Sequence, residues 1–211
     1  MVADMPPFLY KGGLFVLNKF RRKYSAYMIQ QINNEINSCS KCKNNFQKKK
    51  YFGNTNAKIL IINENASNNS EVFDYLIELI NSSDLDLKDV FFATSVACIT
   101  TRLDLGNLVE RCPSSKEVKS CKNYLDRVID IIKPKVIISL GATALNQFKQ
   151  GSNLLEHVET TQYFNGIPTL INFGSLDLFK LNEYKTEEEM DTLINSVINT
   201  FDKAAKYIKE N

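Results

Sequence analysis

Residues 131–144 read IIKPKVIISLGATA, and this stretch decides the fold class. Its central part, residues 134–141, is a largely apolar, β-rich run without polar alternation. Such a run is typical of a strand buried on both faces of a parallel sheet. A helical pattern over 115–132 precedes the run, and Gly141 leads directly into another short helical segment. Helix, buried strand and helix in immediate succession predict an α/β protein.

The same alternation extends along the chain in both directions. Three further strands are predicted, the last of them entered through a turn at Asn165-Gly166: 57–63, 89–98 and 167–173. Further helices are predicted at 18–38, from the N-cap Ser70 onward, and at 186–208. We therefore expect a three-layer α/β/α sandwich with a central, mostly parallel, four-stranded sheet.

Two stretches are predicted to lack regular structure. Residues 1–13, with Pro6-Pro7 and Gly12-Gly13, are expected to form an extended lead-in, and residues 99–113 a loop. Ligands of parallel sheets bind at the carboxyl ends of the strands. Functional residues are therefore expected in four segments: 63–69, 93–102, 141–144 and 172–175.

Length and composition limit the class of protein. The 211 residues fit one domain with an appendage, which we divide into a basic extension and helix (1–38) and an α/β domain (39–211). The 44% hydrophobic and 24% charged residues exclude wholesale disorder. No apolar run approaches the ~18 residues of a membrane span, and the first residues do not resemble a signal peptide. We expect a soluble, intracellular, cytoplasmic protein without a membrane partner.

Positive charge is concentrated at one end of the chain. Residues 1–50 carry ten Lys and Arg but two acidic residues, so the remainder has a net charge of −6 against an overall +2. Clustered basic residues are what a phosphate-binding face requires, although a solvated basic arm is the alternative. The candidate phosphate-contacting residues are Arg21, Arg22, Lys23, Lys48, Lys49 and Lys50, followed by Arg102 and Arg111.

The chain has five cysteines: Cys39, Cys42, Cys98, Cys112 and Cys121. An odd number, in a chain expected to be intracellular, argues against a disulfide framework. Cys39 and Cys42 form a C-x-x-C pair, which directs two thiolates at one metal ion. Two further thiolates would complete a zinc site or an iron–sulfur site. The alternative is an isolated pair, with Cys98 a buried apolar residue.

These motifs together resemble a known family. A C-x-x-C pair precedes the first buried strand, Cys98 ends the second, and Arg111-Cys-Pro113, Glu117 and Cys121 precede the IIKPKVIISLGATA stretch. This order is similar to that of the iron–sulfur branch, often called family 4, of the uracil-DNA glycosylase superfamily. The resemblance implies that residues 39–211 have that fold. It also implies DNA as partner and a [4Fe–4S] cluster held by Cys39, Cys42, Cys98 and Cys121, with Cys112 competing for the place of Cys121.

The catalytic motifs of that family are mostly altered here. Its Gly-Glu-x-Pro-Gly motif corresponds to Asn63-Glu-Asn-Ala-Ser67, in which Glu64 alone survives, and its terminal histidine corresponds to Asn172. The resemblance makes Glu64 and Asn172 the catalytic candidates. It places four residues at the base pocket: Asn65, Phe73, Thr94 and Ser95. The amides at Thr143, which begin the helix after Gly141, are a candidate phosphate contact or an ordinary turn. The single histidine, His157, is interpreted as structural.

Three functions are compatible with this sequence. The first is a non-catalytic DNA-binding protein with a structural cluster and a degraded base pocket, serving as a subunit in DNA replication or repair. The second is an active, divergent glycosylase for uracil or a modified base. The third is a zinc-stabilised adaptor or inhibitor that binds another protein.

Overall fold

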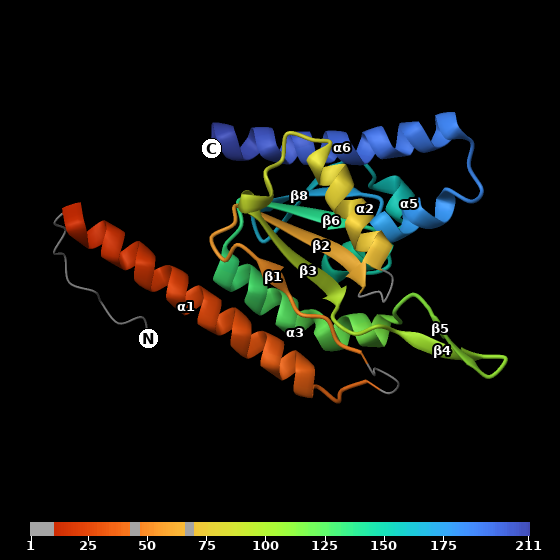
Figure 1. The fold of residues 1–211 in the computed structure, drawn as a ribbon, viewed down its shortest axis with the longest axis horizontal. Coiled ribbons are helices and arrows are strands. Elements are labelled where there is room, and N and C mark those ends of the chain that lie inside the picture. Colours follow the sequence, from red (N-terminus) through yellow and green to blue (C-terminus); the bar gives the residue numbers. More distant parts are fainter. Residues whose placement is uncertain (1–10, 43–46, 66–69) are drawn as a thin grey trace.

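The computed structural model of the chain describes residues 11–42, 47–65 and 70–211 (Figure 1). Its central sheet has the strand order β1-β3-β2-β6-β8-β7. The strands are β1 (Phe52–Gly53), β2 (Ile59–Asn65), β3 (Val90–Val96), β6 (Val136–Leu140), β7 (Thr161–Phe164) and β8 (Ile167–Asn172). β3, β2, β6 and β8 are parallel, whereas β1 and β7 pair antiparallel at the two edges.

The predicted mostly parallel sheet is confirmed, but the predicted number of four strands is wrong. The four expected strands form the parallel centre, and β1 and β7 extend it to six strands. β1 has two residues, which is too short to produce a hydrophobic period. β7 is the first arm of the predicted hairpin at Asn165-Gly166, and it pairs with β8 at the edge of the sheet.

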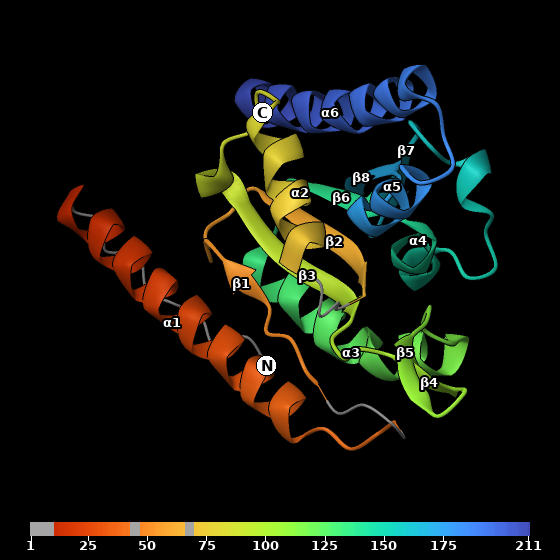
Figure 2. The ribbon, with the colours of Figure 1, turned by 45° about the vertical axis from the view of Figure 1, so that its right-hand side comes forward.

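Helices cover both faces of the sheet, as Figures 1 and 2 show. On one face lie α2 (Ser70–Asn81), α5 (Ser175–Leu181) and α6 (Glu187–Glu210), and on the other α1 (Lys11–Ser38), α3 (Ser115–Ile132) and α4 (Ala142–Phe148). Alternate residues of β2 enter opposite cores, Ile59 and Ile61 one and Leu60 and Ile62 the other. Both cores are apolar, which explains why the strand sequences do not alternate.

The N-terminal helix is longer and more integrated than the sequence predicted. α1 begins at Lys11, so the prediction of an extended segment through Gly13 is wrong for residues 11–13; glycine lowers helix propensity by ~1 kcal/mol but does not end a helix. Ile29, Ile32 and Ile36 are buried in the core shared with α3. The second half of the proposed extension is therefore part of the packed fold, while the first half projects away from the sheet (Figure 2).

Residues 101–110 form a β-hairpin where the sequence predicted a loop. Strands β4 (Thr101–Asp104) and β5 (Asn107–Glu110) pair antiparallel around a two-residue turn, Leu105-Gly106, in which both residues have positive φ angles of 48° and 86°. Such turns favour Asn-Gly or Asp-Gly, so the Leu-Gly pair gave no recognisable hairpin signal. The hairpin projects from the carboxyl end of β3 (Figure 1).

The base of this hairpin is held to α3 by a salt bridge. Both guanidinium nitrogens of Arg111 donate to the Glu117 carboxylate at 2.8 Å, and Arg111 Nε donates to the carbonyl of Thr101 at 3.1 Å. Glu117 also forms a capping box with Ser114 at the start of α3. Mainly through the Arg111 hydrogen bonds, the pKa of Glu117 falls to about 2. Arg111 is therefore engaged in the structure, and its predicted DNA contact would require breaking this pair.

None of the described helices is both long enough and apolar enough to cross a membrane.

Substituting Glu117 by Gln should lower the free energy of unfolding by about 2–3 kcal/mol, because a largely buried charged pair loses one partner. The ordinary pKa of 4.5 lies above the folded value of about 2. The stabilisation is therefore present above pH 4.5 and is lost as the pH falls towards 2. Urea unfolding measures both effects. In the control Asp126→Asn, which breaks the exposed pair with Lys122, the loss should stay within ~0.5 kcal/mol. Equal losses in the two variants would contradict the anchoring role.

Candidate functional site

Glu64 lies at the carboxyl end of the central strand β2, where the ligands of such sheets bind. Its side chain is buried, and its Oε1 accepts a hydrogen bond from the Thr143 backbone N–H at 3.3 Å. Its pKa is raised to about 7, mainly by burial and then by the nearby Asp177, against the lowering effect of the backbone N–H groups of Thr143 and Ala142. Glu64 therefore changes charge near neutral pH, as a general acid or base requires.

Gly141 is required by the position of Glu64. A Cβ atom on residue 141 would overlap Cγ, Cδ and Oε1 of Glu64. Gly141 also has a φ angle of 88°, which favours glycine. The glutamate carboxylate thus lies against the start of α4, and it accepts from the Thr143 amide that the sequence analysis assigned to a phosphate.

Asp177 is a second carboxyl group at this site, and sequence reasoning missed it. Its Oδ2 accepts from the Gly174 backbone N–H at 3.3 Å at the beginning of α5, and burial raises its pKa. A Cβ on Gly174 would lie 3.4 Å from Glu64 Cγ and 3.5 Å from Asp177 Oδ2, so the two acids flank this glycine. The spacing of Gly174 and Asp177 is that of a helix cap, but only the fold brings Asp177 near Glu64.

Asn172, the second catalytic candidate, is turned into the fold. Its Nδ2 donates to the carbonyl and hydroxyl of Ser196 at 3.0 Å and to Thr200 Oγ1 at 2.8 Å, while its Oδ1 accepts from the Phe173 N–H at 2.7 Å. Both Ser196 and Thr200 belong to α6. The side chain is fully buried. The amide of Asn172 therefore joins β8 to α6, and the catalytic role expected of it stays a prediction.

The predicted base-pocket residues are also largely engaged within the fold. Ser95 Oγ donates to the backbone carbonyls of Asn63 and Glu64. Phe73 packs edge-on against Phe52 and Phe92, with ring centroids 5.5 Å apart, and its place at the base pocket stays a prediction. The hydroxyl of Thr94 is buried and has no hydrogen-bond partner in the described part of the chain. The side chain of Asn65 lies outside the described residues.

Cys39, Cys42 and Cys98 all lie near enough to Cys121, on the N-terminal half of α3, to affect its thiol. Cys98 and Cys121 pack together in a small buried cluster, and the Cys39 thiol bonds to Tyr124, one helical turn after Cys121. The pKa of the Cys121 thiol is raised to about 11, mainly by burial; the other three cysteines act in the same direction, and a hydrogen bond with the Ala97 backbone acts against them. Cys112, in contrast, is exposed, and its electrostatic interaction is with Arg111. Even so, the described side chains include no preformed group of three or more His, Cys, Asp or Glu close enough to hold a metal ion.

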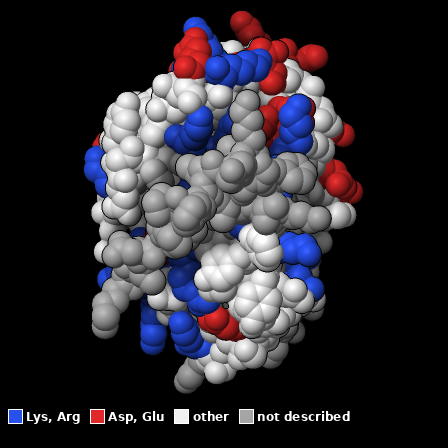
Figure 3. All heavy atoms as spheres, turned by 90° about the vertical axis from the view of Figure 1, so that its left-hand side faces the viewer, with Lys and Arg blue, Asp and Glu red and all other residues white. Residues whose placement is uncertain are grey.

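The basic candidates differ in how free their side chains are. Arg21, Arg22, Lys23, Lys49 and Lys50 are exposed. Lys48 instead donates to the carbonyls of Asn37 and Cys39, at 2.9 and 2.6 Å, where α1 ends, and Arg102 pairs with Asp104 at 3.6 Å. In Figure 3 the described basic side chains of one face form separate groups, mixed with acidic residues towards the top.

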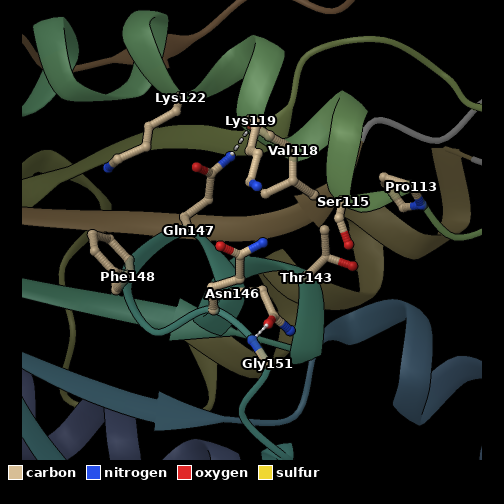
Figure 4. A pocket seen from close by; sticks show the side chains of 11 residues that line it. Pro113, Ser115, Val118, Lys119, Lys122, Thr143, Asn146, Gln147, Phe148 and Gly151 are labelled. Atoms are coloured by element: carbon tan, nitrogen blue, oxygen red, sulfur yellow. Dashed lines mark hydrogen bonds between the residues drawn. The ribbon is translucent and has the colours of Figure 1, made fainter.

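A hollow of about 470 Å³ lies between α3 and α4 (Figure 4). Pro113, Val118 and Phe148 supply apolar lining, and Lys119 and Lys122 extend from α3. Among the described side chains that line it are none of Glu64, Asn172, Phe73, Thr94 and Ser95. The hollow adjoins the Glu64 site at Thr143, whose N–H donates to Glu64, and at Gln147, whose Nε2 donates to the Ser95 carbonyl.

Residues 50–197 match the sequence profile of the uracil DNA glycosylase superfamily. The chain belongs to this superfamily. Within the superfamily it is similar to three proteins named Type-4 uracil-DNA glycosylase. The Thermotoga maritima protein is 34% identical over 79 residues, which cover 37% of this chain and 38% of that protein. The Archaeoglobus fulgidus protein is 28% identical over 128 residues, covering 55% and 61%.

The third relative, from Saccharolobus solfataricus, is 32% identical over 123 residues, covering 52% of this chain and 54% of that protein. The chain thus matches between 38% and 61% of the length of these relatives. Membership of the uracil-DNA glycosylase superfamily accounts for the mostly parallel sheet and for the position of Glu64 at the end of its central strand.

Replacing Asn172 by Ala should reduce the free energy of unfolding by about 2–3 kcal/mol, because Ser196, Thr200 and the Phe173 amide lose a buried partner. Urea unfolding followed by circular dichroism measures the loss. Asn199→Ala, an exposed position on α6, is the control and should change stability by less than ~0.5 kcal/mol. An Asn172→Ala protein as stable as the control would show that this amide is free to serve another role.

Proposed function

We propose that this chain is a DNA-binding protein of the uracil-DNA glycosylase superfamily that does not excise uracil, and that it serves as an intracellular subunit in DNA replication or repair. The inward orientation of Asn172 carries this proposal. All the hydrogen-bonding capacity of its amide nitrogen goes to α6, so no donor from this strand end faces a base. Removing one donor to a developing anion typically costs ~10²–10³ in rate.

The other predicted pocket residues support the same proposal. Ser95 is bonded to the backbone of β2, Phe73 is packed among aromatic rings, and the α4 amide of Thr143 is bonded to Glu64. A base flipped out of DNA must be stacked and hydrogen-bonded within its pocket. Side chains already paired inside the protein would have to break those contacts first, at a cost of 1–3 kcal/mol for each buried group.

DNA is proposed as the partner because of the family and of the exposed basic side chains. Arg21, Arg22 and Lys23 lie on the part of α1 that projects from the domain (Figure 1). Lys49 and Lys50 follow the undescribed segment 43–46. Phosphate contacts of this kind provide affinity without sequence specificity.

We further propose that Cys39, Cys42, Cys98 and Cys121 hold a [4Fe–4S] cluster. The packing of Cys98 on Cys121 and the contact of Cys39 with Tyr124 support this set, and the exposure of Cys112 argues against its inclusion. When bound, such a cluster would fasten the end of α1, the end of β3 and α3 together. Analysis of the purified protein for iron and acid-labile sulfide distinguishes the cluster from zinc.

One observation favours an active, divergent glycosylase as a second candidate. Glu64 is buried at the carboxyl end of β2, and its pKa of about 7 allows it to accept or donate a proton at neutral pH. A carboxylate in this position is able to orient a water molecule or to stabilise a cationic sugar. Asp177, beside it, would be its nearest acidic partner.

An excision assay separates the two candidates. On single- and double-stranded oligonucleotides containing uracil, the chain should produce no abasic sites above background, because the Asn172 amide donates to α6 and does not face the base. Alkaline cleavage of the labelled strand measures the product. Turnover by the natural chain that disappears in Glu64→Gln would establish the second candidate and refute the first.

Neutralising the exposed basic segment should weaken DNA binding uniformly across sequences. The triple variant Arg21→Ala, Arg22→Ala and Lys23→Ala should bind an oligonucleotide at least ~10-fold more weakly and should lower the salt slope by up to about 3. Fluorescence anisotropy over a salt series measures both quantities. The matched control replaces Lys203, Lys206 and Lys209 of α6, on the opposite side of the sheet, by Ala. If both triple variants lose the same affinity, the proposed contact on α1 is wrong.

A further inference from the structure

The tip of the β4–β5 hairpin exposes an unusual amount of apolar surface. Leu103, Leu105 and Leu108 are 73%, 99% and 61% exposed, and all three fall within six residues. Leu103 and Leu108 are direct cross-strand partners, so their side chains lie on the same face of the hairpin. Contiguous apolar surface of this kind, in contrast to single exposed leucines, marks an interaction site.

The backbone at the tip of the hairpin is strained at Leu105, the most exposed of the three leucines. Leu105 has a φ angle of 48°, in the left-handed region where a non-glycine residue costs roughly 1–2 kcal/mol. Asn or Gly would fit this turn position better and would not expose a side chain of this size to water. Backbone strain and apolar exposure thus coincide at one residue, which is typical of a functional position.

The hairpin is also held rigidly at its base. Arg111 joins its second strand to Glu117 of α3 and to the carbonyl of Thr101, and the Arg111 N–H donates to the Thr100 carbonyl at 2.9 Å. A preorganised hairpin loses little conformational entropy when it binds a partner.

The hollow between α3 and α4 has the complementary chemistry. Its apolar lining comes from Pro113, Val118 and Phe148, and Figure 4 shows Lys119 and Lys122 extending from α3 beside it. The hairpin carries Asp104 and Glu110 beside its leucines. An apolar tip with acidic neighbours thus matches a hollow that combines apolar side chains, polar side chains such as Asn146 and Gln147, and two lysines. Its volume of about 470 Å³ has room for leucine side chains.

We propose that the β4–β5 hairpin of one copy of this chain docks into the α3–α4 hollow of a second copy, and that the second copy docks its hairpin in return. Pro113 lies three residues after the end of β5, so hairpin and hollow are neighbours on the same side of each protomer. If a two-fold axis relates the two copies, each hairpin enters the hollow of the other copy. Both contacts are then formed twice, and the assembly is closed as a dimer. The proposal is independent of whether the chain binds DNA.

The charges of the hairpin favour this occupant over DNA. The strands β4 and β5 carry Arg102, Asp104 and Glu110, and Arg102 already pairs with Asp104 at 3.6 Å. A hairpin that enters a DNA groove passes between two rows of phosphates, which repel acidic side chains. Lys119 and Lys122 would attract them instead.

Sedimentation velocity of the full chain over a concentration series tests the proposal. The natural chain should shift from 24.1 kDa towards twice that mass as its concentration rises. Leu105→Asp should weaken association at least ~10-fold. The control Leu155→Asp, at a 71% exposed leucine in the short helix Leu154–Glu156, should not. A natural chain that stays monomeric at every concentration, or equal effects of both variants, would overturn the proposal.

A charge exchange identifies the two surfaces that meet. One variant carries Lys119→Glu and Lys122→Glu, and the other carries Asp104→Lys and Glu110→Lys. Each alone should be monomeric, because hairpin and hollow then have like charges, whereas a mixture should form a heterodimer in which both contacts are complementary. A mixture that remains monomeric would refute this pairing. If Leu105→Asp impairs oligonucleotide binding and leaves association unchanged, the hairpin contacts DNA and the proposal fails.

Discussion

The contact between Glu64 and the turn at Gly141 determines the arrangement of the carboxyl end of the sheet. The glutamate fills the space in which residue 141 would carry a Cβ, and its carboxylate accepts from the first turn of α4. This places a buried acid between the ends of the two central strands, β2 and β6. Gly174 and Asp177 then approach Glu64 from the end of β8. Burial at this point, and after it the neighbouring Asp177, raises the pKa of Glu64 against the hydrogen bonds from the start of α4.

This arrangement also shows how the site differs from an open base pocket. The polar side chains at the strand ends bond to neighbouring elements: Asn172 to α6, Ser95 to β2 and Asn63 to Ser175 of α5. Buried polar groups need partners, and here the protein supplies them. Under the proposed function, these side chains serve the fold and do not contact a substrate. The buried hydroxyl of Thr94 is an exception among the pocket candidates.

Two elements project from the central domain. The second half of α1 packs on α3 through Ile29, Ile32 and Ile36, while its first half projects with three adjacent basic residues. The β4–β5 hairpin projects from the carboxyl end of β3 and is joined to α3 by Arg111 and Glu117. Each element is fixed to the domain at one end and exposed at the other. The exposed ends contribute little to the packed core and are suited to binding another molecule.

The sequence by itself determined the α/β class, the order of the parallel strands along the chain, the helix at 115–132, and the superfamily. These features depend on local periodicity and on short motifs, which are contiguous in the chain. Tertiary structure alone decided the edge strand β1, the hairpin at 101–110, the inward direction of Asn172 and the approach of Asp177 to Glu64. Each of these depends on contacts between residues far apart in sequence, or on a turn whose residues carry no usual signal. The sequence predicts where a strand ends, but it does not predict which residue the side chain at that end contacts.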